Sequence, residues 1–312
     1  MFLANHQNAL LDALLIATHC KRKPYFLTRS DVFKTALLKV FFGFLQMIPV
    51  YRIRDGKNSL AGNTAIFERC AQLLGRGEAV LIFPEGNHSL KRRVRPLSKG
   101  FTRILFLALE SNPSMDIGIV PIGVNYANAA KFPDKAALYY GKEIRVQDFF
   151  DKKDVSGSAS RLKEEVYHHL KKLTTHIEEE SSYEEIVHTL DRAKVDYLDP
   201  AGVNRIIEEG TSPENRKIGK GKVALVKYIL RGAFSILNFP MLIIWSRFIK
   251  PKVSEPEFLS TTRFMYALLF YPFFYLLFIA GMLEFLNWPA TSIICLAHLT
   301  LNIVLVKLSW ED

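Results

Sequence analysis

Apolar residues in the first half of the chain follow two different spacings. Residues 60–74 carry apolar side chains at helical spacing, and residues 101–109 repeat this pattern after a Lys-Gly turn. Three short apolar runs have the length of buried strands: residues 79–83, 117–120 and 137–140. Because strands alternate with helices, we predict an α/β domain over residues 1–150, with a largely parallel sheet flanked by helices.

The pattern changes at residue 151, where charged and polar side chains become frequent. Apolar positions between Leu162 and Ile177 recur at helical spacing, and Ser182 and Glu185 have the spacing of a capping box for a second helix. Residues 208–222 are rich in Gly, Pro, Ser and Lys and have no apolar period. We therefore predict a charged helical segment and linker over residues 151–222.

Two long uncharged runs dominate the C-terminal region. Residues 264–283 and 285–306 contain no Asp, Glu, Lys or Arg. Each reaches the roughly 20 residues that a membrane-spanning helix needs. We predict a transmembrane hairpin over about residues 264–306, within a membrane-associated α-helical region that covers residues 223–312. The alternative is a pair of buried helices in a soluble protein.

Basic residues flank this predicted hairpin: Lys250, Lys252 and Arg263 precede it, and Lys307 follows it. The positive-inside rule then places both ends of the hairpin, and the N-terminal domain, on the cytoplasmic face of a membrane. Residues 223–248 are apolar with scattered basic residues and a break at Pro240. They indicate either an interfacial or re-entrant membrane element, or an amphipathic helix packed on the soluble domain.

The net charge of the chain indicates which classes of partner it could bind. The 41 Lys and Arg exceed the 31 Asp and Glu, which gives a formal net charge of +10. Such an excess favours an anionic partner: a nucleic acid, an acidic membrane surface or a phosphorylated substrate. No nucleic acid is expected, because the sequence has neither an aromatic-interleaved basic platform nor a helix-turn-helix pattern. The three cysteines are widely spaced, so neither a disulfide framework nor a structural metal site is expected.

A histidine and an aspartate near the start of the chain could form a catalytic pair. A neutral imidazole can accept a proton from an alcohol, and a carboxylate on its other nitrogen would orient it. His6 and Asp12 are about 240° apart on a regular helix, so they share no helix face. They can meet only if residues 7–9 form a loop and the helix begins near Leu10. The alternative is a structural histidine.

A second group of polar residues follows the predicted strand 79–83. Glu85 and Gly86 come directly after Pro84, where a loop can present backbone N–H groups to an anion. Four cations follow at positions 91, 92, 93 and 95. A basic cluster beside such a turn suits a phosphate ester. The alternative is a solvated basic loop.

Four blocks of residues occur in the order of the motifs of one family: His6 with Asp12, then 48–52, 83–89 and 120–126. On these blocks, and on Lys99-Gly100-Phe101 downstream of the third, the chain resembles the phospholipid/glycerol acyltransferases. That family includes glycerol-3-phosphate and 1-acylglycerol-3-phosphate acyltransferases. The resemblance covers about residues 2–145.

The resemblance implies a membrane-bound O-acyltransferase of phospholipid biosynthesis. It would move a fatty acyl group from acyl-CoA or acyl carrier protein to a hydroxyl of glycerol-3-phosphate or a lysophospholipid, with 1-acylglycerol-3-phosphate as the first choice. His6 would be the general base and Asp12 its partner, with no acyl-enzyme, cofactor or metal. The implied substrate-binding residues are Arg52, Glu85, Gly86, Asn87, His88, Ser89, Lys91, Arg92, Lys99 and Pro121. The other implied partner is the lipid bilayer.

The sequence departs from the family pattern at two of these motifs. His6 and Asp12 are separated by five residues where the family usually has four. Asn87 and His88 replace a Thr-Arg pair, which removes a fixed guanidinium. Lys91, Arg92 and Arg93 are the candidate replacements. These departures leave a second hypothesis open: a catalytically degenerate lipid-binding or scaffold protein of the same fold.

Overall fold

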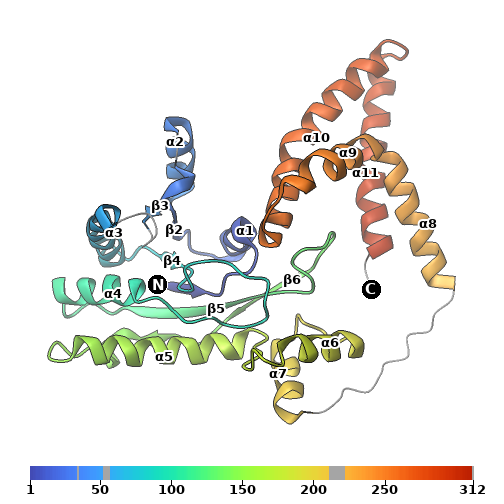
Figure 1. The fold of residues 1–312 in the computed structure, drawn as a ribbon. Coiled ribbons are helices and arrows are strands. Elements are labelled where there is room, and N and C mark those ends of the chain that lie inside the picture. Colours follow the sequence, from blue (N-terminus) through green and yellow to red (C-terminus); the bar gives the residue numbers. More distant parts are fainter. Residues whose placement is uncertain (34, 52–56, 211–221, 311–312) are drawn as a thin grey trace. The chain divides into compact units, whose positions relative to one another are not determined.

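A computed structural model gives the fold of residues 1–33, 35–51, 57–210 and 222–310 (Figure 1). The chain divides into two compact units. The sheet unit comprises Met1–Ala127 and Lys135–Glu214, and the helical unit comprises Asn128–Asp134 and Asn215–Asp312. Arg52, one of the predicted substrate-binding residues, lies outside the described residues, as does most of the predicted linker.

The sheet unit is built on a seven-stranded sheet. Its main path runs β3 (Met47–Val50), β2 (Tyr25–Arg29), β4 (Val80–Ile82), β1 (Phe2–Ala4), β5 (Gly118–Tyr126) and β6 (Ala136–Tyr140), and β7 (Ile144–Arg145) also pairs with β5. The first five strands are parallel, whereas β6 and β7 run antiparallel to β5. The predicted largely parallel sheet flanked by helices is therefore confirmed.

The register of the central strands decides which loops meet. Leu3 of β1 lies opposite both Ile82 of β4 and Pro121 of β5. The loops that follow β1 and β4 therefore leave the sheet at the same edge, the carboxyl edge where sites of such sheets form. Strand β5 continues past the end of β1, from Ile122 opposite Ala4 to Tyr126.

Helices bury their apolar faces against this sheet and against each other. In α4 (Gly100–Ser111), buried residues recur at helical spacing: Phe101, Ile104, Leu105, Ala108 and Leu109. They share one core with residues of α3 (Lys57–Gly75) and α5 (Val155–Leu173). The remaining helices of this unit are α1 (Ala9–His19), α2 (Ala36–Phe44), α6 (Tyr183–Ala193) and α7 (Pro200–Glu209).

Two local predictions in the charged segment are wrong. Helix α5 ends at Leu173, and Ile177 instead packs in a separate small core with residues of α6 and α7. Ser182 occupies the N-cap of α6, but its side chain does not cap the helix. The Ser182 hydroxyl donates to Glu179 Oε2 at 2.6 Å, so the expected capping box does not form.

The helical unit contains α8 (Lys222–Leu237), α9 (Phe239–Ile244), α10 (Leu259–Leu283) and α11 (Trp288–Trp310). Both α10 and α11 are long and apolar enough to cross a membrane, and they coincide with the predicted hairpin. Helices α8 and α9 are bent by 87° at the break between them, where Pro240 enters α9. The segment Asn128–Asp134, which connects β5 to β6, packs in this unit: Ser260 Oγ donates to the Ala129 carbonyl at 2.5 Å.

Candidate active site

The first loop of the site is fixed by the strand that precedes it. Asn5 follows β1, and its side chain exchanges two hydrogen bonds with the backbone of Val124 on β5, at 2.7 and 3.0 Å. The next residue, His6, stacks on the ring of Phe83, the first residue after β4, with 4.0 Å between ring centroids. The two neighbouring strands thus hold the imidazole at the carboxyl edge of the sheet.

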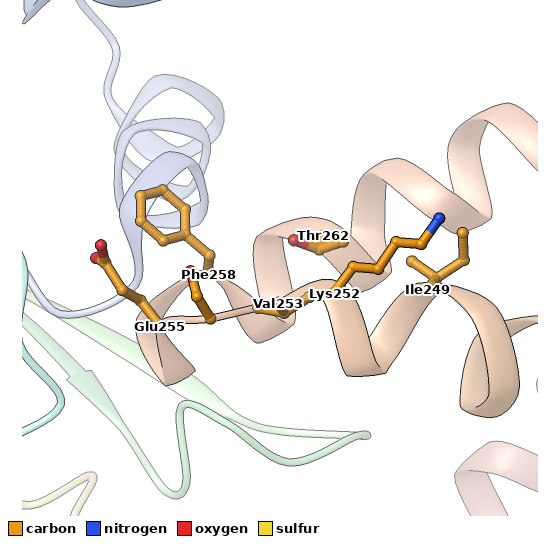
Figure 2. Close-up of a pocket in the computed structure, with 7 residues that line it drawn as sticks. Ile249, Lys252, Val253, Glu255, Phe258 and Thr262 are labelled. Carbon is orange, nitrogen blue, oxygen red and sulfur yellow. The ribbon is translucent and has the colours of Figure 1, made fainter.

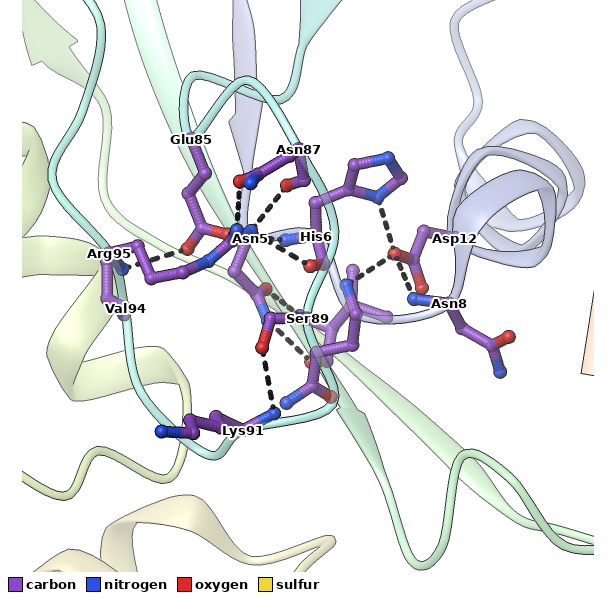
Figure 3. Close-up of polar contacts among 12 residues, drawn as sticks. Asn5, His6, Asn8, Asp12, Glu85, Asn87, Ser89, Lys91, Val94 and Arg95 are labelled. Atoms are coloured by element: carbon purple, nitrogen blue, oxygen red, sulfur yellow. Dashed lines mark hydrogen bonds and ion pairs between the residues drawn. The ribbon is translucent and has the colours of Figure 1, made fainter. Parts of the chain in front are cut away.

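Helix α1 brings a carboxylate to this imidazole. His6 Nδ1 lies 2.8 Å from Asp12 Oδ2 (Figure 3). The helix begins at Ala9, close to the start that the pairing required. Ala9 adopts a left-handed backbone with φ of 42°. This backbone conformation costs an alanine about 1–2 kcal/mol. Ala9 lies between His6 and Asp12, where this chain has one residue more than the family usually has.

Four donors surround the Asp12 carboxylate. Besides His6, the backbone N–H groups of Gln7 and Asn8 donate to Oδ2 at 2.7 and 2.8 Å. The Tyr126 hydroxyl, at the end of β5, donates to Oδ1 at 2.7 Å. Asp12 is fully buried. Since a buried carboxylate with this many donors is held rigidly, Asp12 fixes the proton of His6 on Nδ1 and leaves Nε2 with the lone pair.

The loop after β4 is braced against the loop after β1 by Arg95. Its guanidinium forms an ion pair with Glu85, donates to the side chain and backbone oxygens of Asn87, and reaches the His6 carbonyl at 3.4 Å. Gly86 has φ of 77°, a conformation that favours glycine. Burial raises the pKa of Glu85, and the Arg95 guanidinium opposes this shift. The loop after β4 is therefore a rigid part of the site.

Other predicted residues of this loop lie near His6. The His88 ring stands edge-on to the His6 ring, with 5.5 Å between centroids. The Ser89 N–H donates to the His6 carbonyl at 3.1 Å, and the Lys91 N–H donates to Ser89 Oγ at 3.3 Å. The structure thus brings His6, His88 and Ser89 together.

The two predicted substrate-binding cations of this loop, Lys91 and Arg92, have different partners. Arg92 donates to the carbonyls of Tyr126 and Ala127 at 3.0 and 2.8 Å, and its guanidinium lies 3.3 Å from the centroid of the Tyr197 ring. Lys91 makes an exposed ion pair with Glu180. The guanidinium at the Glu85 loop belongs instead to Arg95, which the sequence showed only as one member of a basic run.

Two predicted residues lie on regular elements. Lys99 is exposed at the N-cap of α4, and its carbonyl accepts the Thr102 hydroxyl at 2.9 Å. Pro121 is buried within β5 opposite Leu3. Their roles stay predictions. Within the described ranges, no three His, Cys, Asp or Glu side chains are grouped so that they could hold a metal ion.

Comparison with known proteins shows what the residues of this site are similar to. Residues 1–125 match the family model described as Acyltransferase. Glycerol-3-phosphate O-acyltransferase 2 of Saccharomyces cerevisiae is 32% identical over 84 residues, and glycerol-3-phosphate O-acyltransferase 1 of the same yeast is 26% identical over 83 residues. Each match covers 27% of this chain and only 11% of the yeast protein.

Among solved structures, the 1-acyl-sn-glycerophosphate acyltransferase PlsC from Thermotoga maritima has a TM-score of 0.38 and 16% identity, covering 57% of this chain and 67% of that one. The family match includes the residues of the His6–Asp12 pair and of the Glu85 loop. Residues 1–125 of this chain, which carry the His6–Asp12 pair and the Glu85 loop, are thus similar to the acyltransferase family.

Proposed function

We propose that this chain is a membrane-bound glycerolipid O-acyltransferase. It would transfer a fatty acyl group from a thioester, acyl-CoA or acyl carrier protein, to a hydroxyl of glycerol-3-phosphate or a lysophospholipid, with 1-acylglycerol-3-phosphate as the first candidate. The observation that carries the proposal is the contact of 2.8 Å between His6 Nδ1 and Asp12 Oδ2 at the carboxyl edge of the sheet. The match of residues 1–125 to the Acyltransferase family model supports this proposal.

The chemistry follows from the proton positions. His6 Nε2 accepts the proton of the acceptor hydroxyl while the hydroxyl oxygen attacks the thioester carbonyl carbon. The tetrahedral intermediate collapses, the carbon–sulfur bond breaks, and the thiolate takes the proton back from the imidazolium. Asp12 stabilises the imidazolium during both steps, so no covalent acyl-enzyme is required.

The loop after β4 would bind the acceptor. Gly86 and Asn87 are exposed on the loop that Arg95 holds beside His6. The exposed Lys91 and the overall positive charge favour approach of a phosphate-bearing acceptor. Arg52 is the proposed phosphate ligand by resemblance, and Pro121 belongs to the block proposed to line the acyl-donor side.

Membrane attachment would come from α10 and α11. Both helices have the length and composition of membrane spans. Lys250, Lys252 and Arg263 lie before or at the start of α10, and Lys307 lies near the end of α11. By the positive-inside rule these ends would be cytoplasmic, which would put the sheet unit at the cytoplasmic face, where lysolipid and thioester meet.

The test measures thiol release from acyl-CoA by the full chain in vesicles, with glycerol-3-phosphate, 1-acylglycerol-3-phosphate and other lysophospholipids as acceptors. His6→Ala should lower kcat by about 10²–10⁴-fold, the usual contribution of a general base. His19→Ala is the matched control, because His19 is an exposed histidine on α1 whose contacts are local. Full activity of His6→Ala, or no transfer by the unaltered chain to any acceptor, would show the proposal to be wrong.

A further inference from the structure

The break between α8 and α9 is surrounded by polar side chains from two otherwise apolar helices. Asn238 sits in the break and is fully buried. Its Nδ2 donates to Asn302 Oδ1 of α11 at 2.7 Å, and its Oδ1 accepts the Tyr271 hydroxyl of α10 at 3.1 Å. Its Nδ2 also reaches the carbonyl of Phe234, one turn back in α8, at 2.9 Å.

A histidine completes this polar cluster. His298 of α11 has Nε2 at 3.2 Å from the carbonyl of Leu237, the last residue of α8, and Nδ1 at 2.9 Å from the Tyr275 hydroxyl of α10. A helix end leaves carbonyls without an intrahelical partner. In hydrocarbon such groups must be satisfied by protein, because no water is present. The cluster therefore has the composition expected of a helix break that lies inside a bilayer.

The cluster also gives the depth of the break. Tyr271 and Tyr275 are near the middle of α10 (Leu259–Leu283), and His298 and Asn302 are near the middle of α11 (Trp288–Trp310). A helix rises about 1.5 Å per residue, so about 15 Å of helix extends from these residues to each end. A hydrocarbon core is about 30 Å thick. If α10 and α11 cross the membrane, the break lies near its centre.

Both ends of the broken pair return to one side of this bundle. On α8, Arg231 donates to the carbonyl of Ser309 at 2.9 and 3.2 Å and lies 5.1 Å from the ring of Trp310, at the end of α11. Beyond α9, Trp245 packs on Tyr266 in the first part of α10, with 5.6 Å between centroids. The end of α11 and the start of α10 lie on the same side, because these helices form a hairpin with one turn between them.

The length and the charges of the α8–α9 segment agree with a path that enters and leaves the bundle on one side. The uncharged stretch between Arg231 and Arg247 has fifteen residues, Gly232 to Ser246, fewer than the roughly 20 of a membrane span. The bent pair as a whole has the length and composition of either a broken span or a re-entrant loop. Several of its large side chains are exposed and apolar, as lipid contact requires: Ile236, Phe239 and Ile243. The turns after α9 carry a pocket of about 300 Å³ lined by both Lys252 and Glu255, a mixture of charges suited to the interface (Figure 2).

We infer that α8 and α9 form a re-entrant hairpin whose tip, at Asn238, reaches the centre of the bilayer. Both ends of the hairpin lie on the side where α10 begins and α11 ends. The side chains of Tyr271, Tyr275, His298 and Asn302 hold the tip. The inference rests on the proposed membrane insertion of α10 and α11, and it is independent of the acyl-transfer chemistry.

The test labels single cysteines in the full chain with a membrane-impermeant maleimide, in sealed vesicles that carry the sheet unit outside. The native cysteines at positions 20, 70 and 295 are replaced by alanine. Leu225→Cys and Lys252→Cys should both be labelled in intact vesicles, because one lies in the first turn of α8 and the other follows α9. Phe285→Cys, in the turn between α10 and α11, should be labelled only after the vesicles are permeabilised. Ile236→Cys, at the tip, should be labelled only after denaturation.

Three results would overturn the inference in different ways. Labelling of Leu225→Cys and Lys252→Cys from opposite sides would make α8 and α9 a span. Labelling of Ile236→Cys in intact vesicles would make them a surface element. Labelling of Phe285→Cys in intact vesicles would remove the spans themselves, whereas acyl transfer by the same vesicles reports separately on the proposed chemistry.

A second variant tests the polar cluster. His298→Leu leaves the Leu237 carbonyl without its partner, so the tip should loosen and labelling of Ile236→Cys in intact vesicles should rise at least tenfold. Leu299→Ala is the control, because Leu299 is its lipid-exposed neighbour on α11. Equal labelling of the two variants would show that His298 does not hold the tip.

Discussion

Replacement of Asp12 by asparagine separates the charge of the carboxylate from its geometry. An asparagine carbonyl in place of Asp12 Oδ2 can still accept from His6 Nδ1 and from the N–H groups of Gln7 and Asn8. Its amide then faces the Tyr126 hydroxyl, which can rotate to accept. The loop and the imidazole should therefore keep their positions, and only the negative charge beside the imidazolium is lost.

The size of the effect follows from Coulomb's law. At an effective dielectric constant of about 20 and about 4 Å between charge centres, the lost attraction is about 4 kcal/mol. If His6 is charged in the transition state and neutral before it, this corresponds to about a thousandfold lower kcat. KM should change little, because Asp12 is buried behind the imidazole and is not placed to contact substrate.

The assay is steady-state thiol release from acyl-CoA at saturating acceptor, together with thermal unfolding of the same preparation. Asp12→Asn should unfold within a few degrees of the unaltered chain and lose about three orders of magnitude in kcat. A loss smaller than tenfold with an intact fold would refute the reasoning, because the imidazolium would then not depend on the carboxylate. A thousandfold loss accompanied by early unfolding would instead show that the asparagine fails to preserve the loop.

Three further predictions follow from the same contacts. Tyr126→Phe removes one hydrogen bond to the carboxylate, worth about 1.5–3 kcal/mol, so kcat should fall at least tenfold with KM unchanged. Arg95→Gln leaves the buried Glu85 without its counter-ion and should lower the unfolding free energy by about 3 kcal/mol in denaturant titrations, and adding Glu85→Gln should restore part of the loss. Burial lowers the pKa of His176 below its usual 6.5, and its Nδ1 accepts from the Val94 N–H. The unfolded chain therefore binds the proton first as pH falls below about 6.5, so the midpoint of thermal unfolding should fall as pH falls. His176→Asn should make the midpoint depend less on pH. An unchanged pH dependence in this variant would contradict the role given to His176.

Local apolar spacing predicted the elements whose signal lies within a few neighbouring residues. Helix α4 and strand β4 were found in this way, because buried positions at short separations define them. Strand β1 was missed, since its three residues become a strand only by pairing with β4 and β5, about 80 and 120 residues away. Strand β5 runs on through Pro121, where the sequence suggested an end, and the Pro121 carbonyl still accepts from Gly141 at 2.8 Å.

The same distinction applies to the site. His6 and Asp12 are close in the sequence, and the condition under which they could meet was worked out from helix geometry alone. Tyr126 lies 114 residues from Asp12, and Arg95 lies 89 residues from His6. Only the register of the sheet brings them to the pair, so no local pattern indicated these contacts. The available signals were weaker: Tyr126 closes the fourth motif block, and Arg95 is one member of the basic run after the Glu85 loop.

The loop Asn128–Asp134 has a consequence for how the chain is assembled. This loop is synthesised early, but Arg263 and Trp310, against which its Phe132 packs, are among the later residues of the sequence. The β5–β6 connection therefore waits for its partners until the last helix is complete. A fragment that stops at residue 210 keeps every strand of the sheet but leaves this loop without the packing of Ser260, Arg263 and Trp310. Deleting the helices thus removes part of the environment of the β5–β6 hairpin, and a fragment without them should need a redesigned loop at residues 128–134.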